Sequence, residues 1–186
     1  MNNILVINGH EYYDFAKGQL NKTLYKDIVS TLSEKFEVKT TIIEEGYDIK
    51  EEQEKFKWAD TVIFQTPIYW FSLPAAFKKY IDQVYEYGVF FGPAINQYGD
   101  GGLMKGKKYM FSTTWNAPES AFNNKDADSF LKGADIEEAI RHLHNMQAYV
   151  NMVPFKTFGA HDVVANPDIE KYRNDLQKHL KEVFEI

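Results

Sequence analysis

The residues best suited to chemistry stand where a buried apolar run empties into a turn. Residues 61–66 read TVIFQT and pass without a polar linker into Pro67, Ile68, Tyr69 and Trp70. Proline fixes φ and lacks an N–H, so it ends the run and leaves a stiff aromatic turn. Rings stack on planar partners, which predicts a site for a flat heteroaromatic cofactor. The alternative, that the two rings only seal the top of a sheet, fits the position equally well.

A second segment has the features of a phosphate site. Residues 9–21 are longer than an ordinary strand-to-helix connection and lead into the start of a helix near Gly18. The unpaired N–H groups and the dipole of a helix N-terminus attract anions, and glycine permits close approach. Asn21 and Thr23 are expected to add side-chain donors, and Lys17 or His10 a further one. For His10, a loop histidine tied to backbone is the favoured alternative.

A third segment resembles the first. Thr114, Trp115, Asn116 and Ala117 follow another apolar run and precede a proline. Two aromatic walls beside a phosphate cradle describe a site for a flat ring attached to a phosphate, as in a flavin nucleotide. The competing interpretation makes Trp115 a core plug, although the residues after it have turn chemistry.

Hydrophobic periodicity supplies the elements that must position these segments. Apolar runs predict parallel strands over residues 4–7, 38–43, 61–66, 107–113 and 155–160. Apolar residues at helical spacing predict helices that start near Gly18 and span residues 49–58, 74–85 and 136–150, with a last one after Asn166-Pro167. The alternation predicts an α/β fold with helices on both faces of the sheet.

Two doubly wound folds fit this alternation. The dinucleotide-binding type needs G-x-G-x-x-G after the first strand, but Asn8 is followed by Gly9 and then by no glycine before Gly18. The flavodoxin-like type, with strand order 2-1-3-4-5, binds its ligand at the loops after the first and third strands. The sequence therefore predicts a flavodoxin-like, five-stranded parallel sheet.

Composition limits the alternatives. The 186 residues, 44% of them hydrophobic, suffice for one domain over 1–186, and the absence of cysteine excludes disulfides and thiolate sites. A net charge of -6 argues against nucleic acid as a partner. We expect no membrane span, no leader peptide, a cytoplasmic location and no metal. We also expect the acidic stretch 51–54 to be solvated, and His142 and His144 to be surface residues.

Several segments together resemble a known family. Residues 1–10, 18–21, 58–60, 78–82, 101–110 and 114–118 are similar to the flavodoxin-like NAD(P)H dehydrogenase (quinone) family, and the likeness spans nearly the whole chain. The resemblance implies a homodimer that binds one FAD per subunit, with active sites lined by both chains. It also implies NADPH as hydride donor and a quinone as acceptor.

The resemblance assigns the cofactor contacts by position. The diphosphate segment would be Ala16, Lys17, Gly18, Gln19, Leu20, Asn21 and Thr23. The loops flanking the isoalloxazine would be Pro67, Ile68, Tyr69, Trp70 and Phe71 on one side, and Thr114, Trp115, Asn116 and Ala117 on the other. Tyr98 would contact the flavin.

The sequence also departs from the family pattern. Close relatives have serine at Ala16, the segment 86–100 is shorter, and no catalytic histidine can be matched. We expect two-electron, ping-pong hydride transfer from NADPH to FAD and then to a quinone, with little help from side-chain acids or bases. The alternatives are an electron carrier or redox-sensing flavoprotein without turnover, and an azo or nitro reductase on the same fold.

Overall fold

Short apolar runs build a parallel sheet whose central strands are buried on both faces. The computed structural model describes residues 2–126 and 128–186. Its strand order is β2-β1-β3-β4-β5, the predicted flavodoxin-like order, with β6 also paired to β4. The strands are β1 (Asn3–Asn8), β2 (Glu37–Ile42), β3 (Thr61–Pro67), β4 (Lys108–Thr114), β5 (Val153–Pro154) and β6 (Phe158–Ala160).

Strand five is where the prediction of one continuous strand is wrong. β5 pairs with the start of β4 and β6 with its end, so two short strands replace the expected one. Between them, the N–H and hydroxyl of Thr157 donate to the carboxylate of Glu137 at 2.8 Å and 2.6 Å. Because a side chain takes this N–H, the ladder is interrupted here.

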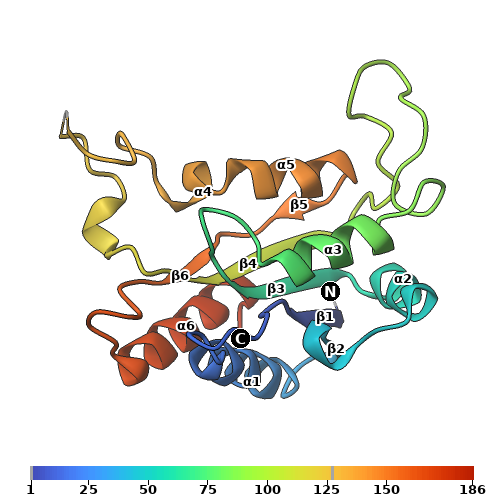
Figure 1. Ribbon diagram of the computed structural model, residues 1–186. Helices are drawn as coiled ribbons and strands as arrows, with labels where there is room; N and C mark the ends of the chain where they lie inside the picture. Colours follow the sequence, from blue (N-terminus) through green and yellow to red (C-terminus); the bar gives the residue numbers. More distant parts are fainter. Residues whose placement is uncertain (1, 127) are drawn as a thin grey trace.

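Helices cover both faces of the sheet (Figure 1). One face is covered by α1 (Gln19–Leu32) and α6 (Ile169–Phe184). The opposite face is covered by α2 (Ile49–Trp58), α3 (Ala75–Val84), α4 (Ile136–Ala139) and α5 (Arg141–Tyr149). Single 3-10 turns occur at Ile43–Glu45 and Glu119–Ala121. Each face has its own apolar core, as the periodicity predicted.

The predicted helix over residues 136–150 is broken. Ile140 has φ −111° and ψ 23°, outside helical geometry, and separates α4 from α5. Its side chain is fully buried, and α4 begins with its own capping box at Asp135. The apolar period therefore located the helical segment but not this bend.

Strand register decides which residues meet at the carboxyl edge. On the face covered by α1 and α6, Val6, Ile63 and Met110 are register partners and form an apolar row. The next row toward the carboxyl edge is polar: Asn8, Gln65 and Ser112. None of the helices in the described residues is long and apolar enough to cross a membrane.

Candidate functional site

The N-terminus of α1 presents unpaired donors at the carboxyl edge. Gly18, the N-cap, has φ 69°, and no side chain caps the helix. The first helical N–H to be used is that of Lys22, which donates to the Gly18 carbonyl at 2.8 Å. The N–H groups before it have no hydrogen-bond partner in the part of the chain that the structure describes: Gly18, Gln19, Leu20 and Asn21. Lys17 and Lys22 are exposed nearby, so this end of α1 can receive an anion.

The side chain of Asn21 is bound inside the protein and that of Thr23 is bound to its own helix, contrary to the expectation that they donate to phosphate. Asn21 is buried; its Nδ2 donates to Asn8 Oδ1 at 2.7 Å, and its Oδ1 accepts from Gln65 Nε2 at 2.9 Å. The Thr23 hydroxyl donates to the Gln19 carbonyl at 2.9 Å, as serine and threonine often do inside helices. The cradle therefore consists of backbone rather than side-chain donors.

His10 lies over this helix end. A Cβ added at Gly18 would come within 2.7 Å of the His10 ring, so glycine is needed both for its positive φ and for space. Burial lowers the pKa of His10, while the nearby carboxylates of Glu44 and Glu11 partly oppose this. The imidazole is therefore neutral at physiological pH without a ligand.

Loop 1, residues 9–18, contains a tight turn of its own. Tyr13 and Ala16 exchange backbone hydrogen bonds of 3.1 Å and 3.0 Å. Phe15, at the tip of this turn, is exposed and its ring stacks on Tyr13 at 5.2 Å. Ala16 has no side-chain hydrogen-bonding group, and its backbone N–H and carbonyl are both bonded to Tyr13.

The loop after β3 forms a second tight turn with unusual backbone angles. Pro67 ends β3, and the Ile68 N–H donates to the Thr114 carbonyl at 3.0 Å. Tyr69 and Ser72 then exchange hydrogen bonds of 2.9 Å and 3.0 Å. The tip residues Trp70 and Phe71 have φ 51° and 63°, a region that large side chains rarely occupy and that costs about 1–2 kcal/mol per residue.

This strained tip exposes its rings and its amides. Trp70 is 95% exposed and Phe71 is 41% exposed. Their N–H groups have no partner within residues 2–126 and 128–186. Strained backbone conformations cluster at active sites and ligand clamps, so this turn is a candidate part of a ligand site.

The loop after β4 differs from the expectation of a second aromatic wall. The Trp115 ring is only 2% exposed, its indole N–H donates to the Thr113 hydroxyl at 2.8 Å, and it packs edge-to-face on Phe122. Trp115 is thus a core plug, the alternative considered from the sequence. Thr114 is also buried, whereas the N–H groups of Asn116 and Ala117 are free of partners among the residues described.

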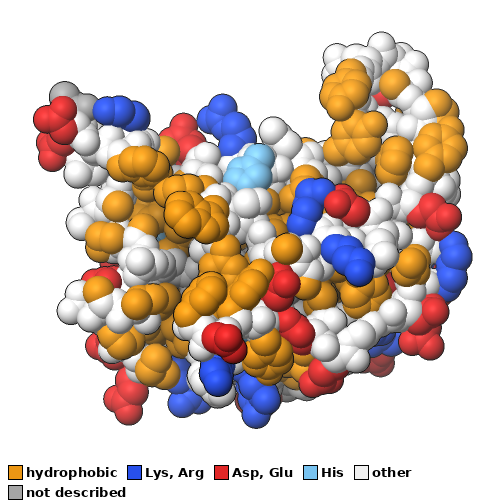
Figure 2. Space-filling model, viewed as in Figure 1, with side chains coloured by type: hydrophobic (Ala, Val, Ile, Leu, Met, Phe, Trp, Pro, Cys, Tyr) orange, Lys and Arg blue, Asp and Glu red, His pale blue; other side chains and the backbone are white. Residues whose placement is uncertain are grey.

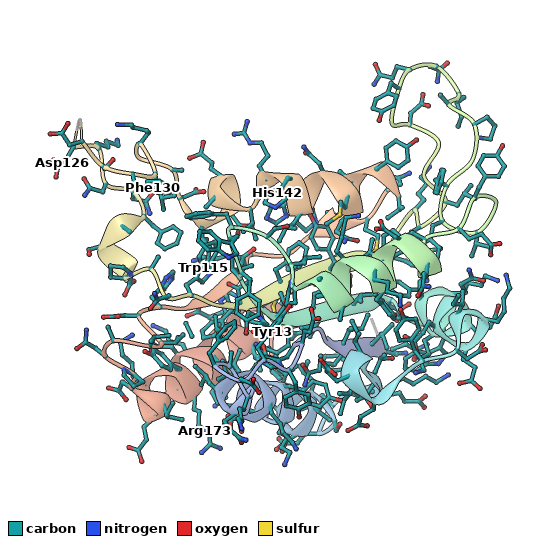
Figure 3. All side chains as sticks on the ribbon, viewed as in Figure 1. Tyr13, Trp115, Asp126, Phe130, His142 and Arg173 are labelled. Atoms are coloured by element: carbon teal, nitrogen blue, oxygen red, sulfur yellow. The ribbon has the colours of Figure 1, made fainter. Side chains whose placement is uncertain are left out.

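Contacts between side chains join these loops into one surface. The Tyr13 ring meets the Tyr69 ring edge-on at 5.6 Å, and the Phe71 ring stacks on Phe130 at 5.3 Å. The Glu11 carboxylate accepts the Ala76 N–H at 2.8 Å and so caps α3 from loop 1. Figure 2 shows hydrophobic side chains gathered in front of the sheet, and Figure 3 places Phe130 and Tyr13 on this side.

Glu11 and Phe130 were not anticipated from the sequence. A lone glutamate in a loop gives no sign that it will cap a helix sixty residues later, and Phe130 lies in an irregular segment without periodicity. His142 also belongs here, because its Nε2 lies 3.3 Å from the Ser72 hydroxyl of the strained turn. His144 is not a surface residue: its Nδ1 lies 2.7 Å from the Tyr109 hydroxyl and its Nε2 2.8 Å from Glu137.

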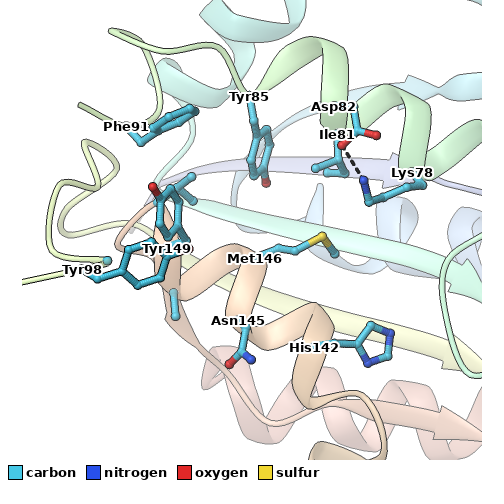
Figure 4. Close-up of a pocket in the computed structure, with 13 residues that line it drawn as sticks. Lys78, Ile81, Asp82, Tyr85, Phe91, Tyr98, His142, Asn145, Met146 and Tyr149 are labelled. Atoms are coloured by element: carbon cyan, nitrogen blue, oxygen red, sulfur yellow. Dashed lines mark hydrogen bonds and ion pairs between the residues drawn. The ribbon is translucent and has the colours of Figure 1, made fainter. Parts of the chain in front are cut away.

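Tyr98 lies away from the other predicted contacts. Its ring meets Tyr149, at the end of α5, with centroids 5.7 Å apart, whereas His142 at the start of α5 touches the strained turn. His142 and Tyr149 are seven positions apart on α5, which is about 10 Å along the helix axis. Tyr98 is 90% exposed and lines a groove of about 730 Å³ between α3, α5 and residues 91–99 (Figure 4).

A metal site is not supported in the described ranges, which contain no group of three or more suitable ligands. The residues do fit a flavin nucleotide. Open N–H groups at α1 suit a diphosphate, and exposed rings with free amides at the next loop suit a planar heterocycle.

Comparisons with known proteins agree with this arrangement. A family model described as flavodoxin-like fold matches residues 2–182. The NADPH:quinone oxidoreductase MdaB of Haemophilus influenzae is 38% identical, over 98% of this chain and 99% of that protein. Among solved structures, a putative quinone reductase from Klebsiella pneumoniae superposes with a TM-score of 0.78 at 23% identity, covering 100% of this chain and 84% of the other.

Another of the similar solved structures was determined with a bound flavin. General stress protein 14 of Treponema denticola, solved in complex with FMN, superposes with a TM-score of 0.70 at 18% identity, over 100% of this chain and 97% of that one. At these identities the solved structures show the fold alone. The family match and the full-length relative confirm the resemblance found in the sequence: this chain belongs to the family of the flavodoxin-like fold.

Proposed function

We propose that this protein is a flavin-dependent NAD(P)H:quinone oxidoreductase that binds FAD at the carboxyl edge of its sheet. The observation that carries the proposal is that the uncapped N-terminus of α1 and the strained Trp70–Phe71 turn lie at the same sheet edge. The 38% identity to a named NADPH:quinone oxidoreductase over nearly the full length supports the same activity.

The diphosphate would be held at the start of α1. The N–H groups of Gly18 to Asn21, which have no partner among the residues that the structure describes, supply the attraction together with the helix dipole and two exposed lysines. Gly18 leaves room beneath His10. Asn21 and Thr23 act by shaping the helix end rather than by touching the ligand. Two phosphates along four amides suit FAD, although an FMN phosphate would meet the same donors; FAD is preferred because of the family resemblance.

The ring would lie between the loops after β3 and β4. Trp70 and Phe71 supply apolar faces, and the free N–H groups of Phe71, Asn116 and Ala117 supply donors for a polar ring edge. A bound flavin would supply the chemistry for hydride transfer from NADPH to a quinone. The protein holds donor and acceptor in turn in one slot, excludes water with its aromatic side chains and directs backbone dipoles toward negative charge. Sharing one slot implies ping-pong kinetics.

The site needs a second copy of the chain for completion. Tyr98 packs on Tyr149, at the end of α5 away from the strained turn of its own chain, and the loop that bears it carries further exposed apolar residues, Tyr87, Ile95 and Leu103. In a homodimer these residues would cover the exposed rings of the partner's sheet edge. Burial of both apolar surfaces would favour the dimer.

The experiment that tests the function has two parts. Mass spectrometry of the small molecule released from the purified protein is expected to show FAD. NADPH oxidation with menadione, without a protein partner, is expected to proceed and to give parallel double-reciprocal lines. Flavin without NADPH consumption would indicate an electron carrier or sensor instead, and turnover of azo or nitro compounds but not menadione would change the acceptor.

A further inference from the structure

A row of buried polar side chains runs beneath the start of α1. Asn8, Gln65 and Ser112 are register partners on three adjacent strands, and Asn21 reaches down to them from α1. All four are at most 5% exposed. We call these four residues the amide row.

The hydrogen bonds of the amide row have one direction. The His10 backbone N–H, which can only donate, is bound by Asn8 Oδ1 at 3.1 Å, so this oxygen must face it. Asn21 then has to present its amino group to the same oxygen, at 2.7 Å. Its carbonyl oxygen is left for Gln65 Nε2 at 2.9 Å, and the Gln65 oxygen accepts the Ser112 hydroxyl at 2.6 Å.

The amide row connects each segment that would hold a flavin nucleotide. Asn21 lies in the first turn of α1, next to the open N–H groups. Gln65 lies two residues before Pro67, and Ser112 two residues before Thr114. The row therefore ties the first turn of α1 to the two strands that lead into the loops around the ring.

Stability alone does not require this arrangement. The adjacent row, Val6, Ile63 and Met110, solves the same packing problem with apolar side chains. A net hydrogen bond contributes only about 0.5–1.5 kcal/mol, and replacing all partners by apolar groups can be neutral. Directional bonds do provide what apolar contacts lack, a fixed rotation and height of the first turn of α1.

Building on the proposed function, we propose that Gln65 is a positioning residue that makes the diphosphate and ring halves of FAD bind together. With the spacing fixed, binding of one half places the other at high effective concentration. If the row is broken, each half of the ligand still binds its own subsite, but the spacing of the two subsites no longer matches the spacing of the two halves in FAD.

The test compares whole and half ligands on Gln65→Met, which keeps the side-chain size. Riboflavin reports the ring subsite and ADP the diphosphate subsite, each by fluorescence or calorimetric titration. We expect both half-ligand affinities to change less than about twofold, while FAD affinity falls about tenfold, equivalent to about 1.4 kcal/mol. Ser112→Ala removes only the last bond of the row and is expected to lower FAD affinity about two- to threefold.

Gln53→Met is the matched control. Gln53 is also a buried glutamine, whose Nε2 donates to the Val84 carbonyl at 3.1 Å, but it lies on α2, away from the site. It is expected to lose stability and to keep FAD affinity.

Three results would overturn the inference. In the first two, Gln65→Met binds FAD as tightly as the wild type, or weakens riboflavin and ADP as much as FAD, which indicates a merely structural role. If Gln65→Met does not fold, Ser112→Ala decides by the same comparison. In the third, the wild type fails to bind FAD, which would overturn the proposed function as well.

Discussion

The amide row and a second buried polar group, around Glu52, solve similar problems with different chemistry. The Glu52 carboxylate is 1% exposed and accepts bonds from the Tyr80 hydroxyl at 2.6 Å, the Thr41 hydroxyl at 2.8 Å and Lys55 Nζ at 2.6 Å. It joins β2, α2 and α3. We call these four residues the Glu52 cluster.

The difference lies in charge and in location. The Glu52 cluster contains a buried carboxylate, and leaving a buried charge unpaired lowers the free energy of unfolding strongly. This carboxylate is enclosed by its own hydrogen-bond partners. The amide row is uncharged and adjoins four open N–H groups at the sheet edge. We infer that the Glu52 cluster serves stability, whereas the amide row serves ligand geometry.

The largest effect is expected for Glu52→Ala. Removal of the carboxylate leaves the buried Tyr80 hydroxyl without its acceptor and Lys55 without its counter-charge, a loss of about 3–5 kcal/mol in the free energy of unfolding. Urea denaturation measures it. Glu54→Ala, on the same helix but with an exposed ion pair to Lys57, is the control and is expected to change stability by no more than about 1 kcal/mol. Equal losses in the two variants would contradict a structural role for the Glu52 cluster.

Gly18→Ala is expected to have the next largest effect. The positive φ costs about 1–2 kcal/mol, and the new Cβ would also press on the His10 ring. Gly106→Ala is the control, since Gly106 has φ 86° with nothing within 4 Å of an added Cβ. Both variants should lose stability in thermal unfolding, but only Gly18→Ala should also lose FAD affinity. Unchanged FAD affinity in Gly18→Ala would show that the diphosphate does not bind at the N-terminus of α1.

Trp70→Ala is expected to affect binding without affecting stability. The ring is almost fully exposed, so its removal costs the folded protein little, but a stacking surface worth about 0.5–1.5 kcal/mol is lost to a bound ring. FAD affinity should fall up to about tenfold in a fluorescence titration. Val153→Ala, at an exposed position on β5, is the control. Equal affinities in the two variants would argue against a ring at the strained turn.

The smallest effect is expected from pH. Burial lowers the pKa of His10 below its usual 6.5, as it does for His142, His161 and His179. The unfolded chain then binds protons first as the pH falls through 6.5, so stability decreases between about pH 7.5 and 5.5. His10→Gln should make this slope shallower.

The amide row has no titratable group and supplies the control for this slope. Gln65→Met should lower stability by a similar amount at each pH and leave the slope of the wild type unchanged. A flatter slope in Gln65→Met, measured by urea denaturation across this pH range, would show that the row depends on the charge of His10.

Most of the fold was predictable because burial leaves a period in the sequence. The apolar runs located the four long strands, and helical spacing located α1, α3 and α6. The break at Ile140 and the interruption at Thr157 were not visible, since each depends on a contact between distant segments, such as Glu137 with Thr157. Local sequence cannot report such contacts.

The sequence could predict which loops lie together. The ends of the apolar runs before Gly18, Pro67 and Thr114 placed three loops at one edge of the sheet, because parallel strands end together. Individual side chains were harder: Trp115 and Asn21 point into the protein, and the acidic stretch expected to be solvated contains the buried Glu52. A polar residue at an inward position of an apolar strand, as at Gln65, was the signal that could have revealed the amide row.

Flavin absorbance during anaerobic mixing of the FAD-loaded protein with NADPH, and then with menadione, tests the proposed function most directly. We expect NADPH to bleach the flavin band and menadione to restore it. A band that NADPH leaves unchanged would show that this sheet edge does not hold a flavin for hydride transfer.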